Sequence, residues 1–169
     1  LDIVIKFNNR KLLSGIITAV CGEISEDVTR KIIMLIDKFA KMSDKELKTQ
    51  FEEIGVTEEK YLELRGLLSS DFESLVIKLD KYELNSVAID GMNEIKELYS
   101  LMDGTAATEI MQFAPYLARG IDIYTGTVWE VFLKDGLIGS GNSQVDFRNT
   151  SIGGGGRYDK IITGFVDDG

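Results

Sequence analysis

The sequence predicts an α+β fold in which an antiparallel sheet, built from two segments of the chain, is interrupted by an all-helical insertion. Three observations predict it. Residues 2–7 alternate like a strand, residues 25–104 carry apolar side chains at helical spacing, and alternation returns after Phe113. The chain therefore divides into three segments: 1–22 and 113–169, which share the sheet, and 23–112, the helical insertion.

The first expected strand opens the chain. Ile3, Ile5 and Phe7 fall on one of its faces, and its β-branched residues favour an extended backbone. Asn8-Asn9 then ends the strand. The run Asn8-Asn9-Arg10 is by default a polar turn, and it becomes an element of a site only in context.

The helical insertion is marked by starts and stops as well as by its period. Val28, Ile32 and Leu35 share one face of the first helix, whose first turn holds acidic side chains that favour a helix N-terminus. Ser followed three residues later by Glu is the pattern of a capping box. Helix starts are expected at Glu26, at the capping box Ser43–Glu46, after Thr57 and at a second capping box Ser70–Glu73, and a last helix is expected from Met92 to Met102, with Gly55 and Gly104 as stops.

The second sheet segment again alternates. Residues 123–133 fall into two alternating sets, as in a strand: Ile123, Thr125, Thr127, Trp129, Val131 and Leu133 alternate with Tyr124, Gly126, Val128, Glu130 and Phe132. Lys134-Asp135-Gly136 predicts a hairpin turn, because Asp-Gly tolerates the positive φ angles of such turns. A further strand pair is expected through Leu137-Ile138 and, after a loop, through residues 145–152.

Missing residue types exclude several kinds of chemistry from this chain. It has no histidine and a single cysteine, Cys21, which excludes an internal disulfide, Cys/His zinc sites, Ser-His-Asp triads and Cys-His dyads. We expect Cys21 to be a buried small hydrophobe without a disulfide partner. Any chemistry rests on Arg, Lys, Tyr, carboxylates and backbone amides, which suit phosphate or adenylate handling better than hydrolysis by a nucleophile.

Charge and hydropathy limit the partners. The net charge is −9, and residues 23–112 hold 20 acidic against 11 basic side chains, so a sequence-independent grip on a nucleic-acid backbone is not expected there. Because no apolar run is long enough to span a bilayer, we expect a soluble protein with no membrane partner. The chain lacks an initiator Met and a secretory signal, and we expect both ends to be cuts through a longer protein.

Arg119 is the first candidate site residue. It follows the apolar run Tyr116-Leu117-Ala118, so we expect its backbone in or beside the sheet, where an unpaired guanidinium is costly. Its partner is either Asp122 or Glu130, which would make the pair structural, or a phosphate, which Arg can grip through two parallel hydrogen bonds. The sequence leaves both alternatives open.

The second candidate element is a run of glycines, Gly153–Gly156. It lacks the spacing of a dinucleotide-binding loop and the Lys-Ser/Thr pair of a P-loop. It is either a flexible turn or bulge, or a place where the backbone approaches a ligand that no Cβ would tolerate. Tyr124 and Tyr158 either offer hydroxyls to a polar ring or are sheet aromatics with satisfied hydroxyls.

Two peptides together resemble those of one enzyme family. LARGIDIYTGTVWE, residues 117–130, is similar to the signature peptide of histidyl-tRNA synthetases, and GGGGRYD, residues 153–159, resembles that family's second glycine-rich peptide. IKFNNRKLLSGI is similar to the segment just after the family's second class II motif, and the helical block resembles its insertion domain. The resemblance covers the whole chain and implies that residues 1–22 and 113–169 belong to the antiparallel sheet of a class II catalytic core.

The resemblance implies roles for the positions that match. Arg119 would contact the α-phosphate of ATP or of histidyl-adenylate as the catalytic cation. Tyr124 would hydrogen-bond the imidazole of the histidine substrate, and Tyr158 would line the same pocket. Ile123 stands where the family has a first tyrosine, which would alter the packing of the pocket. The remaining contacts expected with the substrate are at Gly120, Gly154, Gly155 and Gly156.

Other parts of the family's active site would lie outside the chain. The first two class II motifs would precede Leu1, and the third motif and the anticodon-binding domain would follow Gly169. We therefore expect an internal fragment, inactive alone, of a cytoplasmic homodimeric ligase that uses histidine, ATP and tRNA(His), and whose Mg²⁺ ligands cannot be assigned here. The insertion domain would approach the acceptor arm of the tRNA, and its acidity argues against tight RNA binding of its own.

Two other classes of function are weighed against the enzyme. Paralogues of this synthetase serve as non-catalytic, histidine-sensing regulatory subunits. A sensor needs no phosphate-binding Arg119, and such paralogues usually degrade the arginine-tyrosine pattern, whereas RG-D-YTG and GGRYD are both intact here. That favours the enzyme. A third alternative, a stable helical module without activity, predicts an ordered middle and disordered glycine loops.

Overall fold

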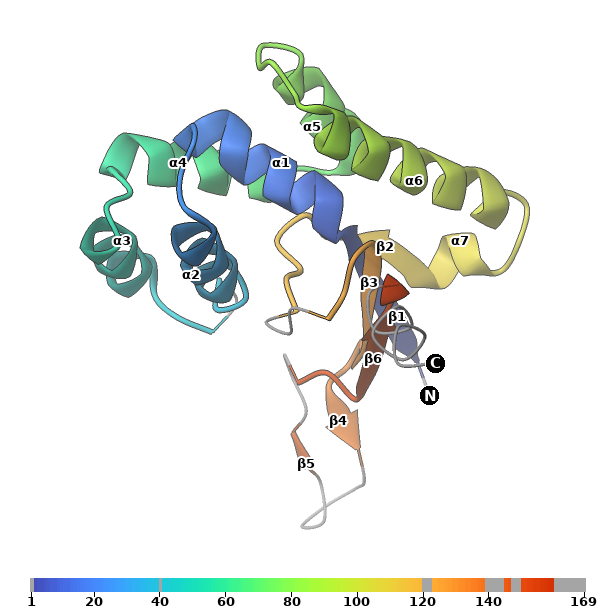
Figure 1. Cartoon of the computed structure of the whole chain (residues 1–169). Helices are drawn as coiled ribbons and strands as arrows, with labels where there is room; N and C mark the ends of the chain where they lie inside the picture. Colours follow the sequence, from blue (N-terminus) through green and yellow to red (C-terminus); the bar gives the residue numbers. More distant parts are fainter. Residues whose placement is uncertain (1, 40, 120–122, 139–144, 147–149, 160–169) are drawn as a thin grey trace, which may run out of the picture.

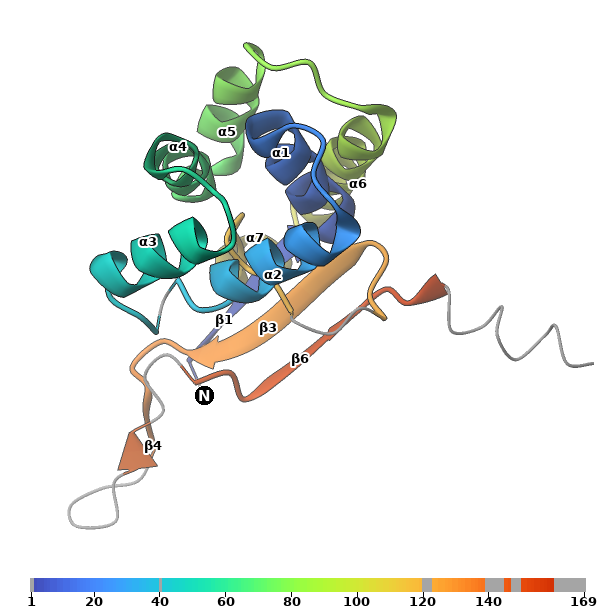
Figure 2. The same ribbon diagram turned by 60° about the vertical axis from the view of Figure 1, so that its left-hand side comes forward.

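The computed structural model describes residues 2–39, 41–119, 123–138, 145–146 and 150–159. The helices gather at one end of a four-stranded sheet, and a small two-stranded sheet projects from the other end (Figure 1). A turned view keeps this arrangement and shows β3 (Thr127–Leu133) and β6 (Gly153–Gly156) side by side (Figure 2). The predicted fold class, an α+β sheet interrupted by a helical insertion, is confirmed.

The larger sheet joins segments that are far apart in sequence. Its strand order is β2-β1-β3-β6, where β1 is Ile3–Asn9 and β2 is Met111–Phe113. β1 and β3 pair antiparallel from Ile3 with Leu133 to Asn9 with Thr127. β6 then adds to the far edge of β3, also antiparallel. The two sheet segments therefore meet around the insertion, as the alternation of the sequence predicts.

The sheet departs from the expected one in three places. The strands on either side of Lys134-Asp135-Gly136, β3 and β4 (Leu137–Ile138), lie in different sheets, so the predicted hairpin is wrong. β2 runs parallel to β1, not antiparallel, because the helices between them supply the long crossover that parallel pairing requires. β3 begins at Thr127 rather than at Ile123, because its partner β1 ends at Asn9, which pairs with Thr127, and the chain then turns into a helix at Arg10. The expected second pair forms between β4 (Leu137–Ile138) and β5 (Val145–Asp146), and residues 147–149 lie outside the described part.

Three of the expected helices begin where the sequence places them, at Glu26, Asp44 and Glu58. The capping box is present at Ser43, whose hydroxyl and backbone amide both bond Glu46, and Thr57 caps the next helix. Gly55 and Gly104 have positive φ angles, as expected of helix stops. The helices are α1 (Arg10–Cys21), α2 (Glu26–Ile36), α3 (Asp44–Glu53), α4 (Glu58–Leu68), α5 (Phe72–Leu79), α6 (Ser86–Met102) and the short α7 (Ala107–Ile110).

Helix α1 was not among the expected elements. Asn9 closes β1 and at the same time caps α1, because its side chain accepts from the amides of Lys11 and Leu12. A signal was present in the sequence: Leu12, Leu13, Ile16, Ile17 and Val20 recur at helical spacing and are all buried. Gly15 and the β-branched residues of this segment lower its helix propensity, which hides the period.

Two helix starts differ from the expected ones. The cap of α5 is Asp71, whose carboxylate accepts from the Ser74 amide at 2.8 Å, while Ser70 instead donates to the Gly66 carbonyl at the end of the preceding helix. The expected capping box at Ser70–Glu73 is therefore wrong by one residue. Helix α6 begins at Ser86, well before Met92, because Asn85 caps it.

One cluster of buried apolar side chains runs from the sheet into the helices. It includes Phe7 of β1, Ile16 of α1 and Ile95 of α6. Close approach of α1 and α6 requires glycine, since a Cβ at Gly15 would overlap Ala88. The division of the chain at residues 22 and 112 stays a prediction.

Cys21 lies in the same core. It is 5% exposed, and burial raises the pKa of its thiol. Within the described ranges, no helix combines the length and the apolar character that crossing a membrane requires.

Candidate functional site

Arg119 is held between a carboxylate and an aromatic ring. It follows the buried residues Leu117 and Ala118, and its side chain is only 20% exposed. One guanidinium nitrogen lies 3.4 Å from a carboxylate oxygen of Glu130 on β3, and the guanidinium carbon lies 5.6 Å from the centre of the Tyr124 ring. Of the two carboxylates considered as partners, Glu130 makes the contact, while Asp122 lies outside the described residues. Among the described residues this ion pair engages one nitrogen of a guanidinium that carries five donors in all.

The surroundings of Arg119 contain charges of both signs. Lys6, Asp37, Lys41 and Glu130 line a small hollow next to Ala118. Burial raises the pKa of Glu130 and of Asp37, and the positive charge of Arg119 opposes both shifts. Arg119 therefore favours the ionised form of two carboxylates whose pKa burial raises.

The glycine run is a strand, so the first of the two alternatives considered for it, a flexible turn or bulge, is wrong. In β6, Gly154 pairs with Glu130 and Gly156 pairs with Val128 of β3. A Cβ at Gly154 would overlap a guanidinium nitrogen of Arg119, and a Cβ at Gly156 would lie 2.5 Å from the Tyr124 ring. The absence of side chains lets Arg119 and Tyr124 lie directly against the backbone of this strand.

The other candidate residues lie around this centre. Gly155 packs on the ring of Trp129, 3.0 Å from a hypothetical Cβ, so it belongs to the opposite face of β6 from its neighbours. Tyr158 is 50% exposed and follows β6. Its peptide is tied to that of Tyr124, because the hydroxyl of Thr125 donates to Asp159 at 2.9 Å. Gly120 lies outside the described residues.

Tyr124 also faces a hollow between helices α1 and α2. Its lining includes three cations and one carboxylate together with Tyr124 and Thr125: Arg10, Lys11, Arg30 and Glu26. Cations, a hydroxyl and an aromatic ring are suited to a small polar substrate that carries negative charge. The hollow can therefore hold such a substrate between the ring of Tyr124 and the guanidinium of Arg10.

The sequence left the role of the Asn8-Asn9-Arg10 run open. In the structure Asn8 and Arg10 support the peptide of Arg119, while Asn9 caps α1. The guanidinium of Arg10 donates to the carbonyl of Arg119 at 2.8 Å, and its backbone amide donates to the carbonyl of Gly126 at 2.9 Å. The signal was a polar run at the end of a buried strand, where polar side chains require partners.

Asn8 holds the peptide that leads to Arg119. It is 1% exposed, and its amide nitrogen donates to the carbonyls of Pro115 at 2.8 Å and Leu117 at 3.0 Å. Asn8→Ala is expected to lower the free energy of unfolding by about 2 kcal/mol, because it leaves two buried carbonyls without a donor. Urea unfolding measures this, with the exposed Asn93→Ala as control. Equal effects of the two substitutions would contradict the role of Asn8.

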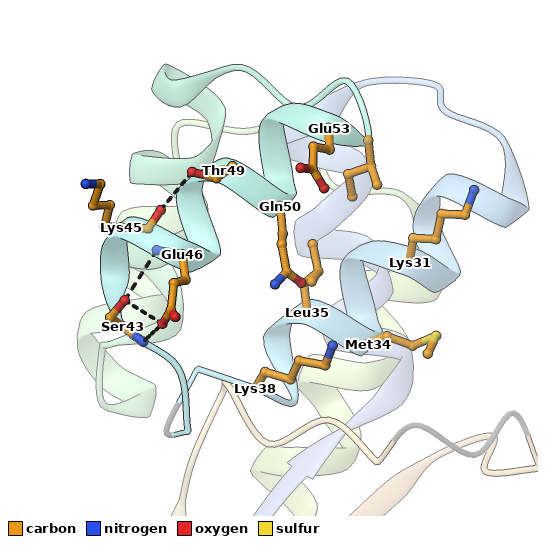
Figure 3. A pocket seen from close by; sticks show the side chains of 11 residues that line it. Lys31, Met34, Leu35, Lys38, Ser43, Lys45, Glu46, Thr49, Gln50 and Glu53 are labelled. Carbon is orange, nitrogen blue, oxygen red and sulfur yellow. Dashed lines mark hydrogen bonds between the residues drawn. The ribbon is translucent and has the colours of Figure 1, made fainter.

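A separate hollow lies between α2 and α3 (Figure 3). Lys31, Lys38 and Lys45 extend around it, and Glu46 and Glu53 line it as well, so its charge is mixed. Lys31 already pairs with Asp27 at 2.7 Å. None of the described candidate residues lines this hollow. The candidate site is therefore the one beside the sheet, around Arg119 and Tyr124.

A protein-family model matches nearly the whole chain. Residues 2–169 match the family model described as histidyl-tRNA synthetase. The chain belongs to the histidyl-tRNA synthetase family. The arginine-tyrosine peptide and the glycine strand are therefore elements of a synthetase sequence, in keeping with the resemblance of both peptides.

Curated relatives extend beyond this synthetase segment. Histidine–tRNA ligase 1 of Bacillus thuringiensis subsp. konkukian (strain 97-27) is 36% identical over 168 residues, which are 99% of this chain and 37% of that protein. Histidine–tRNA ligase of Danio rerio is 28% identical over 181 residues, covering 99% of the chain and 35% of that protein. The chain thus spans little more than a third of the length of these relatives.

Solved structures support the class II synthetase fold. Histidyl-tRNA synthetase from Nostoc sp. PCC 7120 superimposes with a TM-score of 0.73 at 22% identity, over 98% of this chain and 37% of that one. A protein described as an ATP phosphoribosyltransferase regulatory subunit/histidyl-tRNA synthetase, from Bacillus halodurans, gives 0.72 at 16% identity, over 98% and 39%. At these identities the likeness concerns the fold alone.

Proposed function

We propose that the chain is an internal part of a cytoplasmic histidine–tRNA ligase, which activates histidine with ATP and transfers it from histidyl-adenylate to tRNA(His). The observation that carries the proposal is the placement of Arg119 and Tyr124 against the glycine strand β6. Membership of the synthetase family supports it. The whole enzyme would be a homodimer, and residues 23–112 would be its insertion domain, which approaches the acceptor arm of the tRNA.

In this proposal Arg119 stabilises the charge that builds up during adenylation. The carboxylate of histidine attacks the α-phosphorus of ATP, and pyrophosphate leaves. A fixed guanidinium beside the α-phosphate oxygens stabilises that transition state without reorganisation. Arg119 is suited to this because Arg10 fixes its carbonyl and Glu130 its side chain.

The substrate histidine would lie beside the tyrosines. The hydroxyl of Tyr124 would bond its imidazole, Tyr158 would close the pocket, and Gly120, Gly154, Gly155 and Gly156 would approach it through their backbones. Mg²⁺ would accompany ATP. The described residues contain no group of three or more acidic or cysteine side chains that could hold a metal ion, so no Mg²⁺ site is assigned to them.

Histidine-dependent exchange of pyrophosphate into ATP tests this function. We expect exchange in the complete protein, meaning this chain extended at both ends to the length of its relatives, and none in the 169-residue chain itself. Robust exchange by the chain alone would contradict its proposed inactivity. If the complete protein binds histidine but catalyses no exchange, the histidine-sensing alternative replaces the ligase.

A further inference from the structure

Glu94, in the middle of helix α6, joins the helical part to the sheet. One of its carboxylate oxygens accepts from the side-chain amide of Asn9 at 2.5 Å. The other accepts from Lys11 at 2.7 Å and lies 3.5 Å from the guanidinium of Arg157. A single carboxylate therefore contacts the end of β1, the start of α1 and the residue that follows β6.

The partners of Glu94 differ in exposure, since the side chain of Arg157 is 57% exposed and that of Lys11 31%. The side chain of Glu94 is 20% exposed, and Asn9 is fully buried. Burial opposes ionisation of Glu94, but hydrogen bonds from Lys11 and Asn9 outweigh it and lower the pKa of the carboxyl. Glu94 is therefore an anion near neutral pH, and charge-assisted hydrogen bonds of this kind are stronger than neutral ones.

Glu94 also touches the peptide that carries Tyr124. A Cβ at Gly126 would lie 3.1 Å from the Arg157 side chain and 3.3 Å from a carboxylate oxygen of Glu94, so the glycine sits against both. Backbone hydrogen bonds lock the same peptides together, from Thr125 to the Arg157 carbonyl at 2.8 Å and from Arg157 to the Thr127 carbonyl at 2.9 Å. Arg157 directly precedes Tyr158.

We infer that Glu94 is a positioning residue for the histidine subsite, through which the helical insertion fixes the spacing of the Tyr124 and Tyr158 peptides. The inference rests on the proposed function. Glu94 contacts neither substrate. It acts through Arg157 and Gly126. Its loss therefore loosens the pocket for the amino acid. The α-phosphate subsite is affected less, because Arg10 supports Arg119 separately.

Kinetics of the complete protein test the inference. Glu94→Gln keeps the size and an acceptor oxygen but removes the charge, and we expect it to raise KM for histidine about tenfold while KM for ATP changes by less than about twofold. Glu97→Gln, on an exposed position of the same helix, is the control and should leave both constants unchanged. Arg157→Gln should raise the histidine KM likewise, and the double variant by no more than either single one. Additive effects, or an equal rise in both constants, would overturn the inference.

Hydrogen exchange of the 169-residue chain tests the same inference without activity. Glu94→Gln should speed exchange of the Thr125 and Arg157 amides about tenfold, while the Leu47 amide in α3 keeps its rate. Unchanged rates at Thr125 and Arg157 would overturn the positioning role. Absence of histidine-dependent pyrophosphate exchange in the complete protein would refute the proposed function. The hydrogen-exchange rates of the Thr125 and Arg157 amides would still show whether Glu94 fixes the two peptides.

Discussion

Replacement of Arg119 by alanine in the complete protein is expected to lower kcat/KM of histidine-dependent pyrophosphate exchange by about 10²–10³-fold. The fold fixes Arg119 from three sides: Arg10 donates to its backbone carbonyl, Glu130 pairs with its guanidinium, and β6 lies against its side chain. A pre-oriented cation stabilises the transition state at little cost in reorganisation free energy. Its removal should therefore slow the chemical step strongly.

A matched arginine separates this effect from a general loss of charge. Arg65 pairs with Asp44 at 2.8 Å in the helical part, and Arg65→Ala should leave exchange within about threefold of the unsubstituted protein. Arg119→Lys should recover part of the activity, because an ammonium keeps the charge but not the planar fork. Thermal unfolding of each variant shows whether it remains folded. Retention of most of the activity by a folded Arg119→Ala variant would remove Arg119 from its proposed role.

Features that depend on neighbours in sequence were predictable. The capping box at Ser43 and the cap at Thr57 are local, since each satisfies amides within three residues, and the structure contains both. The alternation of residues 2–7 likewise predicts strand β1, and Phe7 of the predicted face lies in the core. Helix α1 was missed although its apolar residues have helical spacing. Asn9 ends β1 and caps α1, so the polar pair Asn8-Asn9 marks a direct change from strand to helix and not a turn.

Features that depend on distant residues were not predictable from the sequence. The strand β6 requires glycine because Arg119 and Tyr124, more than 30 residues earlier, occupy the space that side chains would need. No local rule for glycine contains that information. The choice of Glu130 as the partner of Arg119 likewise depends on the register of β3 against β6, and the contact of Glu94 with Asn9 and Arg157 depends on how α6 packs against the sheet.

Gly154→Ala is expected to damage both stability and the site. Its Cβ would overlap Arg119 and lie 2.8 Å from the backbone carbonyl of Trp129, so Arg119 must move and the β3–β6 pairing must widen. Overpacking of this kind costs about 1–3 kcal/mol of unfolding free energy. Displacement of a catalytic cation by about 1 Å can cost on the order of 10² in rate. Urea unfolding of the chain and exchange kinetics of the complete protein measure the two losses.

Gly153→Ala supplies the control from the adjacent residue of the same strand. The nearest atom to its Cβ would be a methyl group of Val131 at 4.0 Å, and neither Gly153 nor Gly154 has a positive φ angle, so alanine suits the backbone at both. We therefore expect Gly153→Ala to change stability by less than about 0.5 kcal/mol and to leave exchange intact. The contrast between neighbouring glycines isolates the space that Arg119 occupies. Equal losses at both positions would mean that the strand requires glycine for its backbone, and that the packing of Arg119 across β6 is not the reason for the run.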